Sequence, residues 1–192
     1  MLKKEIIWRE ILFQSIERKK RQFTQKDLAR KFNFSLSTVF NALKIPRQVG
    51  AIEVRGRFFT LTNIEKLLNI WSTHRRLEKE IIYKTHADLP VMKIEGTMPG
   101  NIIYTAYSAY RLKFKDAPAD YDKIYAYATD LTEIKKRFPI QAGLANVLIL
   151  KADNFLSDYG LFPPLAQVYA DLWNLKEWYA DDFLKALIKK FF

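Results

Sequence analysis

The segment Ser35–Lys44, with the sequence SLSTVFNALK, constrains the fold more than any other part of the chain. Its apolar residues recur at positions i, i+3, i+4 and i+7, which predicts a helix with one apolar stripe. That stripe consists of Leu36, Val39, Phe40 and Leu43. A second stripe carries short polar groups and a cation, namely Ser37, Thr38, Asn41 and Lys44. Such side chains suit a DNA major groove, since Asn pairs with an adenine edge and Lys reaches phosphate or guanine. Taken alone, the pattern also fits an ordinary amphipathic surface helix.

A second helix is predicted immediately before this segment. Thr24 and Asp27 have the spacing of a capping box. Asn33 ends this helix because Asn tolerates a left-handed backbone, and Ser35 caps the helix that follows. The run QKDLARKFNFSLSTVFNALK therefore resembles the helix-turn-helix of many bacterial and archaeal regulators. A further helix from Lys3 to about Lys20 precedes both.

Two β-like runs follow at residues 51–54 and 58–61, after Pro46 and Gly50 end the helix. Arg55-Gly56-Arg57 lies between them, which predicts a β-hairpin with two arginines at its tip. This hairpin resembles the wing of a winged helix-turn-helix domain, and Arg suits a narrow, electronegative minor groove. The pattern Thr62-x-x-Glu65 predicts a capping box for one more helix, which ends near His74.

Positive charge is concentrated in the first part of the chain. Residues 1–75 contain 16 Lys and Arg against 6 Asp and Glu, a net charge of +10, whereas residues 76–192 carry only +1. This asymmetry indicates a polyanion-binding module joined to a module with another task. We predict a winged helix-turn-helix DNA-binding domain at residues 1–75 and an α/β domain at residues 76–192.

Composition excludes several classes of protein. The chain contains no cysteine, which excludes disulfides, thiol catalysis and cysteine-based zinc sites. No apolar run approaches the eighteen or so residues of a membrane span, and the N-terminal sequence MLKKEIIWRE lacks the pattern of a signal peptide. We therefore expect a cytoplasmic protein with no membrane partner.

Residues 76–192 are predicted to form a mixed α/β (α+β) domain, because strand-like and helix-like runs alternate. The expected strands are Ile81–Thr85, Val91–Ile94, Lys123–Ala128 and Asn146–Lys151. The expected helices are Asn101–Phe114, Thr132–Phe138, one opened by Pro163-Pro164, and Lys176–Phe191. We expect Tyr169, Trp173, Trp178 and Tyr179 to pack in the core, and His74 and His86 to lie on the surface or in loops.

The runs NIIYTAYSAYRLKF, DKIYAYATDLTEIKKRF, ANVLILKAD and PPLAQVYADLWNL resemble the C-terminal domain of AbiEi-type antitoxins. That family joins an N-terminal winged helix to such a domain. The resemblance implies a repressor of its own operon that counters a nucleotidyltransferase toxin in a type IV toxin–antitoxin system. The chain departs from the family in lacking the glycine usual near the start of Thr105–Ala109.

An enzyme is the main alternative. Nucleotidyltransferases place Gly-Ser at a helix start and use three carboxylates to bind two metals. Here Tyr107-Ser108 lies where Gly-Ser would, and the carboxylates would be Asp120, Asp122 and Asp153. Because bulky Tyr107 replaces the phosphate-cradling glycine, we expect a degenerate nucleotidyltransferase-like fold that is not an enzyme and has no cofactor. Whether the three aspartates retain metal or nucleotide binding stays open, as does an RNA-binding interaction module.

The predicted partner is double-stranded DNA, the operator upstream of the protein's own gene. Ser37, Thr38 and Asn41 would contact bases, with Ser35 at the start of the same helix. Other residues are expected to contact phosphates or the minor groove, namely Thr24, Lys26, Lys44, Arg47, Arg55 and Arg57. Three small polar residues read only a short half-site, so useful specificity requires a homodimer or a contribution from DNA shape.

Overall fold

The computed structural model describes residues 1–191, and these form an α+β protein of two compact units. The first unit contains Met1–Arg75 and Pro164–Ala170, and the second contains Arg76–Pro163 and the chain from Asp171 onward. The first unit is therefore not continuous in sequence. Among the described residues, no helix is both long enough and apolar enough to cross a membrane.

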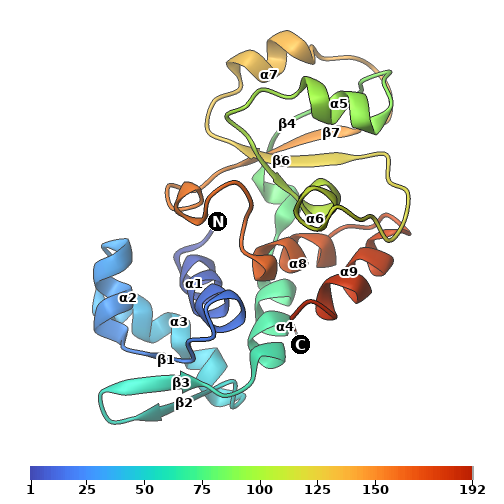
Figure 1. Cartoon of the computed structure of the whole chain (residues 1–192). Coiled ribbons are helices and arrows are strands. Elements are labelled where there is room, and N and C mark those ends of the chain that lie inside the picture. The colour runs from blue at the N-terminus through green and yellow to red at the C-terminus, as the bar shows by residue number, and fades with distance from the viewer. Residues whose placement is uncertain (192) are drawn as a thin grey trace. The chain divides into compact units, whose positions relative to one another are not determined.

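The first unit combines helices with a small antiparallel sheet (Figure 1). Its helices are α1 (Lys3–Glu17), α2 (Gln25–Phe32), α3 (Leu36–Gln48) and α4 (Ile64–His74). Its strands are β1 (Gln22–Phe23), β2 (Ile52–Arg55) and β3 (Phe58–Leu61), in the order β1-β3-β2. The hairpin of β2 and β3 confirms the prediction, with Arg55 opposite Phe58 at its tip. Strand β1 was not predicted, because a two-residue strand has no periodicity to detect.

Local capping signals define the turn between α2 and α3. The Thr24 hydroxyl accepts a hydrogen bond from the Asp27 amide, and Ser35 accepts one from the Thr38 amide. Asn33 adopts the predicted left-handed conformation, with φ of +52°. These three residues confirm the predicted helix boundaries. At α4 the prediction was wrong by one residue, because Asn63 caps the Lys66 amide while the Thr62 hydroxyl donates to backbone carbonyls.

Pro46 does not end α3, contrary to the sequence prediction, and the helix continues to Gln48. A proline inside a helix has no amide to donate to the carbonyl four residues earlier, which here is that of Ala42. That carbonyl instead accepts a buried hydrogen bond from Trp8 Nε1 at 2.8 Å. Helix α1 therefore supplies the donor that Pro46 lacks.

The buried face of α3 is displaced from the predicted one. Leu36 and Phe40 are 57% and 47% exposed, so neither belongs to the core. The buried residues are Val39, Ala42, Leu43 and Pro46, which again follow the spacing i, i+3, i+4 and i+7. The predicted helical period is confirmed, but two neighbouring stripes of α3 share this spacing, and the more apolar stripe is not the buried one.

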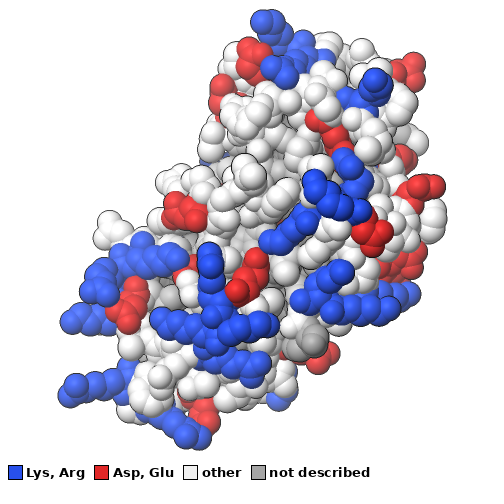
Figure 2. Space-filling view, viewed as in Figure 1, with Lys and Arg blue, Asp and Glu red and all other residues white. Residues whose placement is uncertain are grey.

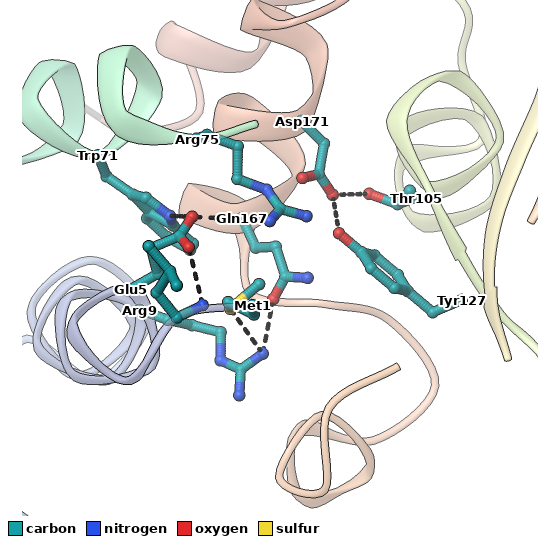
Figure 3. A network of polar contacts seen from close by, with 10 residues as sticks. Met1, Glu5, Arg9, Trp71, Arg75, Thr105, Tyr127, Gln167 and Asp171 are labelled. Carbon is teal, nitrogen blue, oxygen red and sulfur yellow. Dashed lines mark hydrogen bonds and ion pairs between the residues drawn. The ribbon is translucent and has the colours of Figure 1, made fainter. Parts of the chain in front are cut away.

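Helix α1 is buried on all sides over residues 5–12, including its charged side chains. Glu5 accepts a hydrogen bond from Trp71 Nε1 at 3.3 Å and lies 3.6 Å from Arg75 Nη1. Arg9 Nη1 donates to Gln167 Oε1 at 3.1 Å, as Figure 3 shows. Gln167 lies in the first part of α8 (Leu165–Trp173), so these contacts tie residues 164–170 to the first unit.

The second unit is built on a mixed four-stranded sheet (Figure 1). Its strands are β4 (Ile81–Thr85), β5 (Ile103–Thr105), β6 (Ile124–Ala128) and β7 (Val147–Lys151), in the order β4-β7-β6-β5. Strands β6 and β7 are parallel, and the other two pairings are antiparallel. Its helices include α5 (Val91–Thr97), α6 (Ala106–Phe114), α7 (Thr132–Arg137), the end of α8 and α9 (Ala180–Ile188). Two short 3-10 turns lie at Leu77–Glu80 and Ser157–Tyr159.

Three segments of this unit differ from the sequence prediction. Residues 91–94 begin helix α5 rather than a strand, because the Pro90 carbonyl accepts hydrogen bonds from the Lys93 and Ile94 amides. The predicted helix at 101–114 starts later, at Ala106, since Ile103–Thr105 pairs with β6. The first difference has a local cause, whereas the second depends on a partner about twenty residues later in the sequence. Helix α9 also starts later than predicted, at Ala180.

Strand β6 is buried on both faces, which explains its run of five buried residues. Ile124, Ala126 and Ala128 pack in one core cluster with Ile94 of α5 and Ile134 of α7. On the opposite face, Tyr127 packs in a second core cluster with Leu150 and Leu156. Tyr125 on that face joins an aromatic cluster that includes Tyr107, Tyr121, Tyr179 and Phe183. Tyr169 and Tyr179 are buried as predicted, but Trp173 and Trp178 are 44% and 77% exposed, which contradicts the predicted core position.

Candidate nucleic-acid interface

Helix α3 presents an exposed polar face on the side opposite its buried stripe. Successive residues are rotated by about 100° around a helix axis, so Ser37, Asn41 and Lys44 point away from Val39 and Leu43. All three are exposed. Gln48 extends the same face by one turn and is exposed as well. The sequence prediction missed Gln48 because the helix was expected to end before Pro46.

The hydroxyl groups at the start of α3 form a small cluster. Ser35 Oγ lies 2.9 Å from both Ser37 Oγ and Thr38 Oγ1, and it also caps the Thr38 amide. Thr38 is half-buried and lies toward the edge of the exposed face. Ser35 thus has a capping task and Thr38 is half-buried, whereas Ser37 and Asn41 are exposed to a ligand.

A groove of about 300 Å³ lies between α3 and the hairpin. Its lining residues are Gln25, Phe40, Leu43, Lys44, Arg47, Gln48 and Val54. Lys44 and Arg47, two predicted phosphate contacts, therefore lie at one groove, and its lining contains no carboxylate. The Lys44 ammonium is 5.5 Å from the centre of the Phe40 ring.

Two predicted contacts lie at the start of α2. The Thr24 hydroxyl donates to Asp27 Oδ2 at 2.8 Å and accepts from the Asp27 amide at 3.0 Å, so capping occupies it. Lys26 is exposed. Asp27 also pairs with Arg30 at 2.8 Å. Of the two predicted residues, Thr24 is thus occupied in capping, whereas Lys26 presents an exposed charge.

The hairpin tip carries two arginines in different situations. The turn consists of Gly56 and Arg57, and the Gly56 φ of +58° suits the first position of a two-residue hairpin turn. Arg55, the last residue of β2, donates through Nε and Nη2 to both carboxylate oxygens of Glu53 at 3.1 Å. This hydrogen-bonded pair raises the pKa of Arg55. Arg57 is exposed at the turn itself.

The excess positive charge of the chain lies in the first unit. Residues 164–170 carry no charged side chain, so the first unit keeps the net charge of +10 found for residues 1–75. Figure 2 shows Lys and Arg side chains dense over the region that α1, α2 and the hairpin occupy in Figure 1. The first unit is therefore the polycationic part of the chain.

The carboxylates of the enzyme alternative do not come together. Asp120 is exposed, Asp122 Oδ1 accepts from the Tyr179 hydroxyl at 2.5 Å, and Asp153 Oδ1 accepts from the Phe155 amide at 3.1 Å. Residues 1–191 contain no group of three or more His, Asp or Glu side chains arranged to hold a metal ion. Tyr107 is fully buried, and its ring lies 4.8 Å from that of Tyr179 in the aromatic cluster.

Glu177 connects several polar groups of the second unit. Its carboxylate accepts hydrogen bonds from Lys123 at 2.5 Å and from Tyr107 and Tyr125 at 3.1 Å. Burial alone would raise the pKa of Glu177, but the bonds from Lys123 and Tyr107 outweigh it and the pKa lies below its usual value. Burial and then the Glu177 charge raise the pKa of Tyr107 and of Tyr125 far above that of free tyrosine.

A second buried carboxylate lies at the start of α6. Asp171 accepts hydrogen bonds from Thr105 Oγ1 at 2.7 Å and from the Tyr127 hydroxyl at 2.6 Å (Figure 3). Thr105 is the residue that precedes α6, so the Asp171 carboxylate is bonded at the N-terminal end of that helix.

The two histidines have backbone partners within their own units. His74 Nδ1 lies 2.9 Å from the Ile70 carbonyl oxygen, and His86 Nδ1 lies 2.9 Å from that of Leu144. Both are half-buried; His86 lies in a loop, as predicted, and His74 is the last residue of α4.

Comparison of the chain with protein-family models, with curated proteins and with solved structures gave no match.

Proposed function

We propose that the chain is a cytoplasmic, sequence-specific DNA-binding transcriptional regulator whose first unit is a winged helix-turn-helix domain. Helix α3 would enter the major groove, and the β2–β3 hairpin would lie along the minor groove or backbone. The observation that carries this proposal is the exposed stripe Ser37, Asn41, Lys44 and Gln48 on α3, opposite the buried stripe. The net charge of +10 on the same unit supports a polyanionic partner.

The contacts divide by task. Ser37, Asn41 and Gln48 would read base edges, since side-chain amides and hydroxyls pair with the edges of A and other bases. Lys26, Lys44, Arg47, Arg55 and Arg57 would neutralise phosphates, which gives affinity without reading sequence.

The test is binding of the whole chain to DNA from upstream of its own gene, compared with a random duplex of equal length at about 0.15 M salt. We expect preference for the upstream DNA. Asn41→Ala should cost about 1–3 kcal/mol on that DNA only, whereas Arg57→Ala should weaken both duplexes and lower the salt dependence. Equal binding of both duplexes by the unchanged chain would contradict sequence-specific regulation, and tighter binding to single-stranded RNA would favour the RNA-binding alternative.

For the second unit we propose the role of an antitoxin domain in a type IV toxin–antitoxin system, with a degenerate nucleotidyltransferase-like fold and no catalytic activity. The buried Tyr107 and the Thr105–Asp171 hydrogen bond support this view, because they occupy the region that a nucleotide would need. The test is whether the adjacent gene encodes a nucleotidyltransferase-like protein that arrests growth, and whether co-expression of this chain restores growth. Nucleotide incorporation that depends on Asp122 would instead support the enzyme alternative.

A further inference from the structure

Large apolar side chains lie exposed on the same face as the proposed base-reading residues. Phe40 lies one turn from Ser37 and next to Asn41 on α3, and it is 47% exposed. Val54 of β2, across the groove, is also exposed, and Leu43 forms part of the lining. A partner that covers this apolar surface with an apolar group would gain affinity, because removing apolar surface from water is favourable.

The residues that line the groove limit which kind of partner could bind there. The apolar surface of Phe40 and Val54 is bordered by Lys44 and Arg47, by the amides of Gln25 and Gln48, and by no carboxylate. The occupant must therefore combine an apolar group with nearby negative charge and hydrogen-bonding edges. In a DNA major groove the apolar group is the thymine C5-methyl, which projects beside the base edges and between the phosphate strands.

We infer that Phe40, with Val54 behind it, reads thymine methyl groups, so that the preferred site has thymine beside the base pair contacted by Asn41. This inference rests on the proposed DNA-binding function and adds a specificity-determining residue to it. Ile45 offers a matched comparison, because it is also an exposed apolar residue of α3 but lies on the other side of the polar stripe and outside the groove lining.

The experiment begins with selection of preferred duplexes from a randomised pool by the whole chain. The selected duplex is then synthesised with thymine or with deoxyuridine, which lacks only the methyl group, at each position in turn. Loss of one buried methyl should weaken binding about fourfold at the thymine that faces Phe40. Phe40→Ala should bind both duplexes alike, whereas Ile45→Ala should keep the discrimination.

The outcomes separate the inference from the function on which it rests. If no duplex is enriched, the proposed DNA binding itself fails. If a duplex is enriched but contains no thymine whose methyl matters, or if Phe40→Ala still discriminates, the inference is overturned while DNA binding stands. A change of oligomeric state in Phe40→Ala, with discrimination unchanged, would assign the groove to a second copy of the chain. Both substitutions replace exposed side chains, and circular dichroism checks that each variant is folded.

Discussion

At the scale of single residues, the two arginines of the hairpin show how a neighbour alters the charge available to a ligand. Both Arg55 and Arg57 match a basic hairpin tip in sequence, yet Arg55 forms a bidentate ion pair with Glu53 while Arg57 lies in the turn. An ion pair between two exposed side chains contributes little to stability, because solvent screens it. It nevertheless competes with any phosphate for the same guanidinium.

We predict that Glu53→Gln tightens duplex binding by up to about fivefold, because it frees Arg55 and removes a negative charge from the hairpin. The salt dependence should also steepen, since one more cation displaces counterions. Fluorescence anisotropy titrations at two salt concentrations measure both effects. Glu133→Gln is the control, because Glu133 also forms an exposed ion pair, with Arg137 of the second unit. An equal gain in both variants would show a general charge effect.

Ala106 carries an unusual backbone conformation for its residue type. Its φ is +50° at the start of α6, where it is fully buried. This is the segment that lacks the glycine usual in the resembling family. An L-residue other than glycine in the left-handed region costs about 1–2 kcal/mol.

We predict that Ala106→Gly lowers the free energy of unfolding by about 1–2 kcal/mol less than Ala109→Gly does. Both changes remove one buried methyl group from the same helix, but only the first relieves backbone strain. Urea unfolding of the two variants gives the difference. Equal costs would mean that the conformation at Ala106 is not strained.

At the scale of elements, Pro46 shows that a helix can depend on a donor from another helix. Pro46 has no amide to donate to the Ala42 carbonyl, and the Trp8 side chain of α1 donates to that carbonyl instead. We predict that Trp8→Phe leaves this buried carbonyl unsatisfied and costs about 1–3 kcal/mol in addition to lost packing. Pro46→Ala restores a backbone amide four residues away, so Trp8→Phe should cost less in that background. A double-mutant cycle in urea measures the coupling, and additive costs would contradict the proposed role of Trp8.

The elements that could be predicted from sequence are those with local causes. Thr24, Asn33 and Ser35 set the ends of α2 and α3 through side chains and backbone angles a few residues apart. The hairpin at residues 52–61 has its turn glycine in the sequence between two strand-like runs. By contrast, strand β5 exists because it pairs with β6, about twenty residues later. Such partners leave no local pattern.

The same distinction applies to the candidate site. The polar stripe on α3 was predictable, because helical spacing places Ser37, Asn41 and Lys44 together. The exposure of Phe40 was not, since Phe40 belongs to an apolar stripe with the same spacing as the buried one. Gln48 was missed because the donor that allows α3 to continue past Pro46 comes from Trp8, forty residues away.

At the scale of the whole molecule, the two units differ in their ionisable groups. The first is strongly cationic, whereas the second holds a cluster of buried tyrosines around Glu177. Burial, followed by nearby charges, raises the pKa of five tyrosines well above the usual range. They are Tyr104, Tyr107, Tyr121, Tyr125 and Tyr179.

A tyrosine whose pKa is raised by folding favours the folded state below the unfolded pKa of about 10, and this contribution is lost as pH rises further. We therefore predict that these five tyrosines stay protonated above pH 10 until the second unit unfolds. Tyrosinate absorbance of the native chain should lag behind that of the chain in guanidinium and then rise together with loss of structure. Identical titration curves in both solvents would contradict the prediction.

The return of residues 164–170 to the first unit has a consequence for the order of events during synthesis. Gln167 accepts a hydrogen bond from Arg9 of α1, and the Leu165 amide donates one to Glu17 of the same helix. At about 5–20 residues per second, a ribosome makes these residues several seconds after it has made Arg75. The cationic unit is thus completed only once most of the second unit has been made. A nascent chain that ends before residue 164 would lack these contacts, so the first unit reaches its final packing only after residues 164–170 have been made.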